Sequence, residues 1–582
     1  MNITAIIAYK SNRAGQFAPK RLKVFLKWLQ GSGFLDGKEF SINEAENGIL
    51  LHISGDAKIN VNLFSDSDDF CFSTTTPMIS TRHVQHLSGY EKEIRNAIRN
   101  GFTLSRYLSP FFLSFRDKDT LGVATDPLGF GRAYCYEDQD ILVSSNHIGL
   151  CSAFGTGFVE DREAWLGFAA FGWFNYNLSP FSQVKRLEPG IKISVTDAIV
   201  KKQTYFDYGS LFVSEDREVL KKDTLTELKT SIYNVSRISR EPLNVMLSGG
   251  KDSRLTAAAV LSSGADCIVQ TINTLQEEVT VAKSLMMAAD RKNLHRITQP
   301  GESKKVGSLS QSIQKRSENC MLIWDGDFNP NQLSRNTGFN TPKKFTVSGG
   351  GGEIAHGNYY SSTELLARIE QLSDPTDWLR RYFSNTKGVR QEASLFVDGL
   401  FDHISEKMTR YGVSGASVLD GFYLIERYRR WIAAGHRSMS LVPYASISFV
   451  RLSMSLTPSE RLHNKIHIEL TSRLIPEWSG IPYFKGKPSG VDERSKKGLR
   501  IWQGEHREEF FDLVETAKTN SIWDRQQIDG MLNELSSGNG NGLLEGSFQR
   551  ILWTHSFSEH QKKMKDFFRN LGDDRSDGTH AV

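Results

Sequence analysis

The sequence predicts a mixed α/β protein in which a strand-rich N-terminal part precedes a parallel-sheet part and a mainly helical C-terminal part. Short alternating apolar segments separated by turn residues fill the chain as far as about Asp207, a pattern typical of half-buried strands. From about Ser214 short apolar strands alternate with longer helical periods, which favours a parallel sheet with crossover helices. Beyond about Asp398 most of the periodicity is helical.

The length of 582 residues exceeds what one hydrophobic core supports, so two or three domains are expected. We place a first domain at residues 1–207, a second at residues 214–571 and a flexible tail at residues 572–582. Hydrophobic residues make up 39% and charged residues 24% of the chain, as in an ordinary globular protein.

The charge balance and the cysteines exclude several classes of protein. Lys and Arg number 71 against 67 Asp and Glu, a net charge of +4, which gives no support for a nucleic-acid partner or an acidic membrane surface. The five cysteines are odd in number and lack CxxC spacing. A disulfide scaffold or a zinc site is therefore not expected, and a reducing cytoplasm is favoured.

The apolar segments are too short for a membrane protein. The first residues hold too short an apolar run for a signal peptide. The most apolar stretch, Ala164–Phe174, is flanked by Glu163 and Asn175 and is too short to span a bilayer. We expect it to form a buried helix.

In the first domain, alternating apolar residues predict strands at Ile49–Ile53, Lys58–Phe64 and Phe111–Phe115. The segment Asp126–Gly129 contains Pro and Gly and predicts a turn. The Pro-Gly pair that ends Val184–Gly190 predicts a type II turn between strands.

In the second domain, short apolar runs predict strands at Leu243–Leu247, Cys267–Ile272 and Lys344–Val347. Helical periodicity predicts helices at Leu255–Ser262, Val279–Ala289, Leu400–Met408, Ser417–Ala434, Ile466–Leu474, Leu499–Ala517 and Glu545–Phe568. The Gly- and Asn-rich stretch Ser536–Gly542 predicts a loop.

The stretch Leu247–Arg254 reads LSGGKDSR and lies between a predicted strand and a predicted helix. Such a turn leaves backbone N–H groups unpaired at a helix N-terminus, where the dipole favours an anion. Paired glycines let a phosphate approach the backbone, Ser248 and Ser253 add hydroxyl donors, and the carboxylate of Asp252 can hold Mg²⁺ on the phosphates. The alternative is a strand-to-helix turn that contains Ser and Gly for structural reasons.

This stretch resembles the SGGxDS pyrophosphate loop of the ATP pyrophosphatase superfamily, and it lacks the Gly-Lys-Ser/Thr ending of a Walker A motif. Those enzymes cleave ATP to AMP and pyrophosphate and thereby activate a carbonyl group as an adenylate. The resemblance implies that Leu247, Ser248, Gly249, Gly250, Asp252 and Ser253 bind ATP.

A second glycine cluster, SGGGGE at residues 348–353, follows the predicted strand Lys344–Val347. It is similar to the S-G-x-G-x-D-E segment of the same enzymes, so Ser348 and Gly349 are expected to line the nucleoside and Glu353 to join Asp252 on Mg²⁺. By the same resemblance Ile272 binds the nucleotide through its main chain. The alternative is a glycine loop with a helix-capping Glu.

The chain as a whole resembles the asparagine synthetase family, in which a class II glutaminase-like domain precedes an ATP-using synthetase domain. The N-terminal resemblance rests on three pieces in the family's order, which are Asp126–Tyr136, Leu166–Gly172 and Val184–Gly190. It implies an Ntn-like αββα sandwich followed by a parallel-sheet ATP pyrophosphatase domain with a helical C-terminal part.

One departure concerns the nucleophile of the glutaminase domain. Glutaminases of the family carry a catalytic cysteine directly after the initiator Met, and its own amino group can act as the base. Here residue 2 is Asn2, and the next cysteine is Cys71. We therefore expect no hydrolysis of glutamine by the first domain, as in family members that form lactams.

The resemblance also implies a catalytic carboxylate, which falls at Glu426 in the helical stretch before Val442-Pro443. In lactam-forming relatives this Glu pairs with a Tyr as the base for an attacking amine, but the matching Tyr position is Gly350 here. Glu426 would then act alone or with another partner such as Tyr423. The alternative is a structural carboxylate paired with Arg430 at i+4.

The segment Ile481–Gly490 lies where the family carries a lysine that contacts the phosphates. Lys485 and Lys487 are both candidates to stabilise the negative charge that develops during adenylation. The alternative is an exposed basic loop.

Together these residues predict an AMP-forming, ATP- and Mg²⁺-dependent ligase that joins a carboxylate to an amine, such as a lasso peptide cyclase, a lactam synthetase or another enzyme of antibiotic or natural-product synthesis. The expected partners are a carboxylate substrate, or a precursor peptide with its leader-binding protein or protease, and the sequence leaves a homodimer open. Two alternatives are an ammonia-using amidotransferase, for example of a polysaccharide, and a protein that binds ATP without catalysis.

Overall fold

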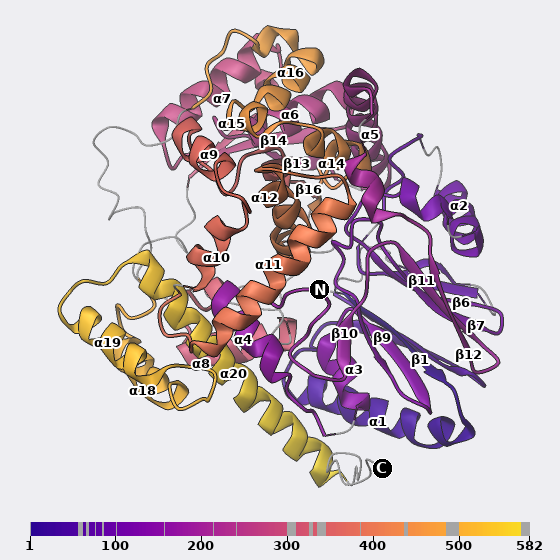
Figure 1. The fold of residues 1–582 in the computed structure, drawn as a ribbon. Helices are drawn as coiled ribbons and strands as arrows, with labels where there is room; N and C mark the ends of the chain where they lie inside the picture. Colours follow the sequence, from indigo (N-terminus) through magenta and orange to yellow (C-terminus); the bar gives the residue numbers. More distant parts are fainter. Residues whose placement is uncertain are drawn as a thin grey trace.

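The computed structural model describes residues 2–571 apart from 56–61, 66–68, 76, 84–86, 101, 156, 214, 240, 300–309, 325–329, 335–344, 385, 436–439 and 485–499. Over this range the protein is a mixed α/β structure with two antiparallel sheets and one parallel sheet, as the sequence predicts (Figure 1). The predicted tail at 572–582 lies outside the described residues. No helix in the described part of the chain is both long and apolar enough to span a bilayer.

The N-terminal part contains two six-stranded antiparallel sheets that pack face to face. The first sheet has the order β10 (Val184–Arg186), β8 (Tyr134–Glu137), β9 (Ile141–Ser145), β1 (Ile3–Tyr9), β3 (Gly48–Ser54), β2 (Glu39–Ala45). The second has the order β12 (Ile199–Thr204), β11 (Ile191–Thr196), β7 (Thr120–Thr125), β6 (Phe112–Asp117), β5 (Asp69–Ser73), β4 (Asn62–Ser65).

Alternation along the strands explains this sandwich. Ile6 of β1 joins Phe112 and Val123 of the other sheet in one core, whereas Ile7 of β1 lies in the core that includes Leu22 of α1. Successive side chains of a strand point to opposite faces, so each sheet buries both faces. Helices α1 (Asn12–Gly31) and α3 (Ile148–Phe154) pack on the first sheet, and α2 (Leu87–Asn100) packs beside β4 of the second.

The apolar stretch Ala164–Phe174 overlaps α4 (Arg162–Phe171), whose residues from Ala164 to Phe171 are all buried. The prediction of a buried helix is confirmed. Helix α4 packs on α11 and α20 of the C-terminal part.

The second sheet system is a five-stranded parallel sheet with the order β15 (His295–Thr298), β14 (Cys267–Ile272), β13 (Leu243–Met246), β16 (Thr346–Val347), β17 (Ser440–Leu441). The chain moves outward from β13 to β15 and then returns to the other side of β13. The connection after β13 leads to β14 on one side and the connection after β16 leads to β17 on the other, and such a switch point is where open α/β sheets bind ligands.

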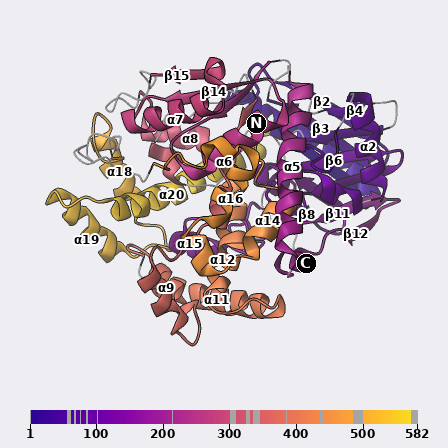
Figure 2. The same cartoon turned by 90° about the horizontal axis from the view of Figure 1, so that it is seen from above.

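Helices α6 (Lys251–Ser263) and α7 (Gln276–Ala288) pack on this sheet, and α5 (Arg217–Ile238) and α16 (Lys465–Leu474) pack on α6. The remaining α-helices are α8 (Ile313–Trp324), α9 (Thr363–Glu370), α10 (Asp377–Ser384), α11 (Glu392–Arg410), α12 (Ser417–Phe422), α13 (Arg429–Gly435), α14 (Ile447–Met454), α15 (Pro458–Leu462), α18 (Arg507–Ala517), α19 (Arg525–Ser536) and α20 (Gly542–Asn570). Figure 2 shows the N-terminal sheets on one side of the molecule and α18 and α19 on the opposite side.

Two helix predictions differ from the structure. The segment Leu499–Ala517 is not one helix, because α18 begins only at Arg507. Gly504 there has a left-handed φ of +83°, which a continuing α-helix does not tolerate, and the apolar Trp502 is buried in the preceding turn. The segment Ser417–Ala434 is helical, but it contains a π-helical piece, η7 (Tyr423–Tyr428).

Candidate functional site

The two glycine clusters lie against each other at the switch point of the parallel sheet. We call residues 247–253 the first glycine loop and residues 348–353 the second. They follow the adjacent parallel strands β13 and β16, so both leave the same edge of the sheet. A Cβ atom on Gly349 would lie 3.1 Å from both the Cα and the nitrogen of Ser253, so a larger residue at position 349 would push the two loops apart by a few tenths of an ångström.

The first glycine loop is closed by its two serines. The hydroxyls of Ser248 and Ser253 lie 2.8 Å apart, and the N–H of Ser248 donates to Ser253 Oγ at 3.1 Å. Gly250 is the N-cap residue of α6, and its N–H donates to Ser248 Oγ at 3.2 Å. These contacts fix the shape of the loop, and the first turn of α6 directs its N–H groups toward the switch point.

Arg254 fixes the segment that leads to the candidate lysines. Its guanidinium is buried, donates to the carbonyls of Ile481 and Pro482 at 2.7 and 2.8 Å, and lies 3.7 Å from the ring centroid of Tyr483. The N–H of Phe484 donates to the carbonyl of Gly249 at 3.0 Å. The candidates Lys485 and Lys487 follow directly but lie outside the described residues, so their role stays a prediction.

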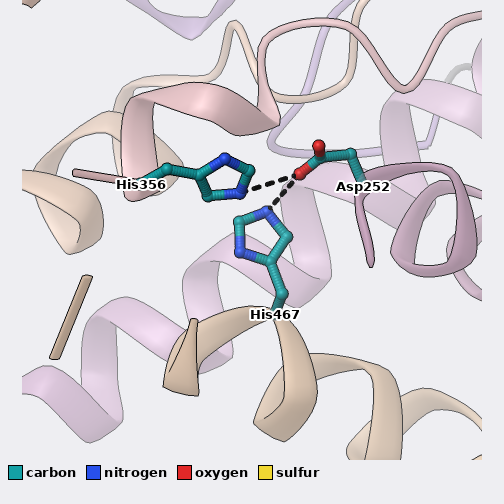
Figure 3. A group of neighbouring side chains, drawn as sticks. All are labelled: Asp252, His356 and His467. Carbon is teal, nitrogen blue, oxygen red and sulfur yellow. Dashed lines mark ion pairs between the residues drawn. The ribbon is translucent and has the colours of Figure 1, made fainter. Parts of the chain in front are cut away.

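Three side chains converge beside the two loops (Figure 3). Oδ1 of Asp252 lies 3.1 Å from Nε2 of His356 and 2.9 Å from Nε2 of His467. Asp252 comes from the first turn of α6, His356 ends η6 (Gly352–Ala355), and His467 comes from α16. The sequence patterns above single out neither histidine, and His467 is a buried residue of α16 that carries no local signal.

The protonation of this group follows from its surroundings. Burial raises the pKa of Asp252, but His356 and His467 lower it more, so the pKa lies well below its usual range. Burial lowers the pKa of His356 to about 4, although Asp252 opposes the shift. At neutral pH the cluster therefore pairs an ionised carboxylate with a neutral His356 imidazole, which can act as a metal ligand.

Glu353 does not belong to this cluster. Its Oε2 accepts the N–H of Gly351 at 2.7 Å, the local capping contact that the sequence left open as an alternative. Burial is the largest cause that raises the pKa of Glu353, and the charge of Asp252 raises it further, so the two carboxylates are close enough to repel each other. A shared metal between them stays a prediction.

The remaining nucleotide-binding candidates also lie at the carboxyl ends of the parallel strands. Leu247 is buried and its N–H donates to Gln270 O at 2.8 Å. Ile272 ends β14, next to β13. The N–H of Ser348 donates to Leu441 O at 2.9 Å, and Ser348 Oγ accepts from Gly350 N at 3.0 Å. The structure brings these residues to one edge, and their contact with a nucleotide stays a prediction.

The π-helical piece η7 places its tyrosines on the second glycine loop. The hydroxyl of Tyr428 donates to Gly351 O at 2.7 Å. Tyr423 is buried, its ring centroid lies 5.8 Å from that of Tyr428, and burial together with the charge of Glu353 raises its pKa. A π-helical turn holds one more residue than an α-helical turn and so changes the direction of the side chains around it. Such turns are frequent at functional sites.

Glu426 of η7 contacts the N-terminal domain. Its Oε2 lies 3.0 Å from Nη1 of Arg430, and its carboxylate accepts from Asn175 Nδ2 at 3.3 Å and from Tyr176 N at 3.2 Å. It also lines a cavity of about 600 Å³ between residues 176–208 and residues 403–429. The i+4 ion pair that the sequence allowed is present, and a catalytic role for Glu426 with Tyr423 stays a prediction.

Breaking this ion pair is expected to destabilise the protein. Both side chains are at least nine-tenths buried, so Glu426→Gln removes the charge partner of the buried Arg430 and should cost about 3 kcal/mol of unfolding free energy. Urea unfolding measures the change. The matched control is Glu392→Gln in the half-exposed pair with Arg162, which should change stability by less than about 0.5 kcal/mol. Equal effects of the two substitutions would contradict a structural role for Glu426.

The N-terminal domain offers no thiol at the position that the glutaminase reaction needs. The main-chain carbonyl of Asn2 accepts a hydrogen bond from Asn146 Nδ2 at 2.8 Å. The side-chain amide of Asn2 donates to Thr74 O at 3.1 Å and accepts from Gly55 N at 2.7 Å. Cys71 is fully buried, and burial raises its thiol pKa far above the usual range. Thiolate formation, which nucleophilic attack requires, is suppressed there.

We therefore expect no glutamate release when the purified protein is incubated with glutamine. Addition of ATP should not change this, because the side chain of residue 2 is an amide and cannot act as the nucleophilic thiol. An enzyme-coupled glutamate assay measures the release. Hydrolysis above the level of a heat-denatured control would contradict this reading of the domain.

No protein-family model matches the chain, and no curated protein matches it significantly. The assignment of a function therefore rests on the residues and their geometry.

Proposed function

We propose that this protein is an asparagine synthetase-like ligase that adenylates a carboxylate with ATP and joins it to an amine. The observation that carries the proposal is the contact between the first and second glycine loops at the switch point of the parallel sheet. A nucleoside triphosphate needs main-chain amides at a helix N-terminus for its phosphates and a crevice at strand ends for its nucleoside. The N-terminus of α6 and the ends of β13 and β16 lie there together, which supports the proposal.

The proposed reaction has two steps. A carboxylate oxygen of the substrate attacks the α-phosphorus of ATP, the bond between that phosphorus and the oxygen bridging to the β-phosphorus breaks, and pyrophosphate leaves. The nitrogen of an amine then attacks the acyl carbon, a base takes its proton, and AMP leaves. The N–H groups of the first glycine loop would stabilise the leaving pyrophosphate, since fixed donors act strongly where charge develops.

The finer fold assignment belongs to this proposal. Two antiparallel sheets with helices packed on them support an Ntn-like αββα domain, and the parallel sheet with its glycine loops supports an ATP pyrophosphatase domain. Because no thiol serves the first domain, the amine would come from the substrate or from a second molecule. A peptide that closes into a macrolactam, delivered by a leader-binding protein or protease, fits this chemistry.

The fit of Mg²⁺ to the site can be judged from the donor set. The groups nearest the Asp252 carboxylate are two imidazole nitrogens, whereas Mg²⁺ prefers oxygen ligands in an octahedral shell. Magnesium therefore does not fit this set well, and no step above depends on it.

A protein that binds ATP without catalysis is the second candidate. It is favoured by Gly350 at the position of the family's Tyr and by the engagement of Glu426 with Arg430. Both observations leave the amine without an evident base.

Exchange of radiolabelled pyrophosphate into ATP tests the proposal, since it reports the first step alone. We expect exchange that depends on a carboxylate from a panel of peptides and small acids, with AMP as the nucleotide product once hydroxylamine is added as the amine. Formation of ADP and phosphate would contradict the proposal. Tight ATP binding with no exchange for any member of the panel would favour the second candidate.

A further inference from the structure

The cluster of Asp252, His356 and His467 has the spacing of metal ligands. One ligand atom from each residue lies within 4.8 Å of the others, and the two Nε2–Oδ1 distances are 3.1 and 2.9 Å. Two donors of a tetrahedral zinc ion with bonds of about 2.1 Å lie about 3.4 Å apart, so the two histidines would move away from the Asp252 oxygen by less than about 0.5 Å to take such an ion. Figure 3 shows both rings directing a nitrogen at the same carboxylate oxygen.

Hydrogen bonds within the described residues do not account for this convergence. Oδ1 of Asp252 and Nε2 of both histidines are buried, and none of the three atoms has a partner with hydrogen-bond geometry among the residues that the structure describes. The side chain of His467 is completely buried. The two ion pairs lack hydrogen-bond geometry. A buried polar group without a hydrogen bond costs about 1–3 kcal/mol, and a cation shared by the three atoms would remove that cost.

The surroundings hold the three residues in place. The ring of His467 packs against Tyr444 and Phe449, with centroids 6.1 and 6.0 Å away. The hydroxyl of Tyr444 donates to the main-chain carbonyl of Asp252 at 2.7 Å. A Cβ at Gly352 would lie 2.3 Å from Oδ1 of Asp252. An apolar shell and fixed second contacts of this kind orient the ligands of metal sites.

We propose that Asp252, His356 and His467 bind one divalent transition-metal ion of the zinc or cobalt type. Imidazole nitrogen suits these ions, whereas Mg²⁺ prefers carboxylates, phosphates and water. Three protein ligands leave coordination positions open, as in catalytic rather than closed structural sites. Asp252 belongs to the first glycine loop, so phosphate oxygens could fill those positions. That last role rests on the proposed function, and the site itself rests on its ligands alone.

Metal titration without nucleotide tests the site. The full chain is freed of metal with a chelator and titrated with Co²⁺, followed by the visible absorption of the bound ion, and with Zn²⁺ against a chromophoric chelator. We expect one ion per chain. His356→Asn and His467→Asn should each weaken binding by at least about tenfold, because loss of even an outer contact costs that much. The matched control is His52→Asn, a buried imidazole in the N-terminal domain that stacks on Phe72.

Several results would overturn the site. The first is Co²⁺ binding that is undiminished in both histidine variants. The second is a loss of Co²⁺ affinity in the control as large as in the variants. The third is binding of Co²⁺ or Zn²⁺ that is no tighter than binding of Mg²⁺. If His467→Asn does not fold, the Co²⁺ affinity of His356→Asn decides whether the site exists. His356 is partly exposed, so its substitution should disturb folding less. Failure of the proposed function gives a different pattern: the metal binds through these ligands but no pyrophosphate exchange occurs. Exchange with Mg²⁺ alone and no Co²⁺ binding would retain the ligase and remove the site.

Discussion

Asparagine in place of Asp252 is expected to lower carboxylate-dependent pyrophosphate exchange by roughly a thousandfold, the upper range for loss of one electrostatic group in an active site. The substitution keeps the shape of the side chain but removes its negative charge. In the native chain that charge faces two imidazoles at the first turn of α6. It can hold a cation next to the phosphates, and a neutral amide holds one far more weakly.

The structure should survive this change. The main-chain carbonyl of Asp252 still accepts from the hydroxyl of Tyr444, and the first glycine loop keeps its serine contacts. Circular dichroism and the unfolding midpoint provide the folding control. A folded Asp252→Asn protein with full exchange would show that the cluster takes no part in the reaction.

Alanine in place of Gly352 is expected to reduce exchange by about a hundredfold or more, within the range of active-site losses, with a smaller effect on stability. The added methyl group would lie 2.3 Å from Oδ1 and 2.7 Å from Cγ of Asp252, so the carboxylate must turn away from His356 and His467. Overpacking of this kind costs about 1–3 kcal/mol of stability. Misplacement of one reacting group by about 1 Å is enough for a large loss of rate.

The matched control is Gly399→Ala. Gly399 lies within α11, and a Cβ there meets nothing within 4 Å. This change should leave exchange unaltered and stabilise the helix by up to about 1 kcal/mol, since alanine favours a helix over glycine. If Gly352→Ala leaves both pyrophosphate exchange and Co²⁺ binding as unaltered as Gly399→Ala does, the close packing of the second glycine loop on Asp252 is not needed for either activity.

The sequence predicts the local parts of the site well, because they are short patterns. A strand, a glycine turn and a helix occur together at 243–263, and β13 and α6 follow that order. The second glycine cluster follows the short strand β16, as expected. Parallel pairing of the two strands then brings the two glycine loops to one edge, so their contact follows from the prediction of a parallel sheet.

The distant parts of the site could not be predicted from sequence patterns. His467 lies on α16, which packs against α6, and nothing in its neighbourhood distinguishes it from an ordinary core histidine. Glu426 was placed by its spacing in the sequence, but its orientation toward Asn175 and Tyr176 depends on how the two domains pack. The π-helical piece η7 likewise follows from tertiary packing rather than from periodicity.

Hydrogen exchange with and without ATP tests most directly whether the nucleotide binds between the two glycine loops, and it needs no knowledge of the carboxylate substrate. We predict slower exchange at the amides of residues 249–253 and 349–351 when ATP and a divalent cation are present, because bound phosphates would accept from N–H groups at the start of α6. ATP that binds, as shown by equilibrium dialysis, without protecting either glycine loop would contradict the proposed site.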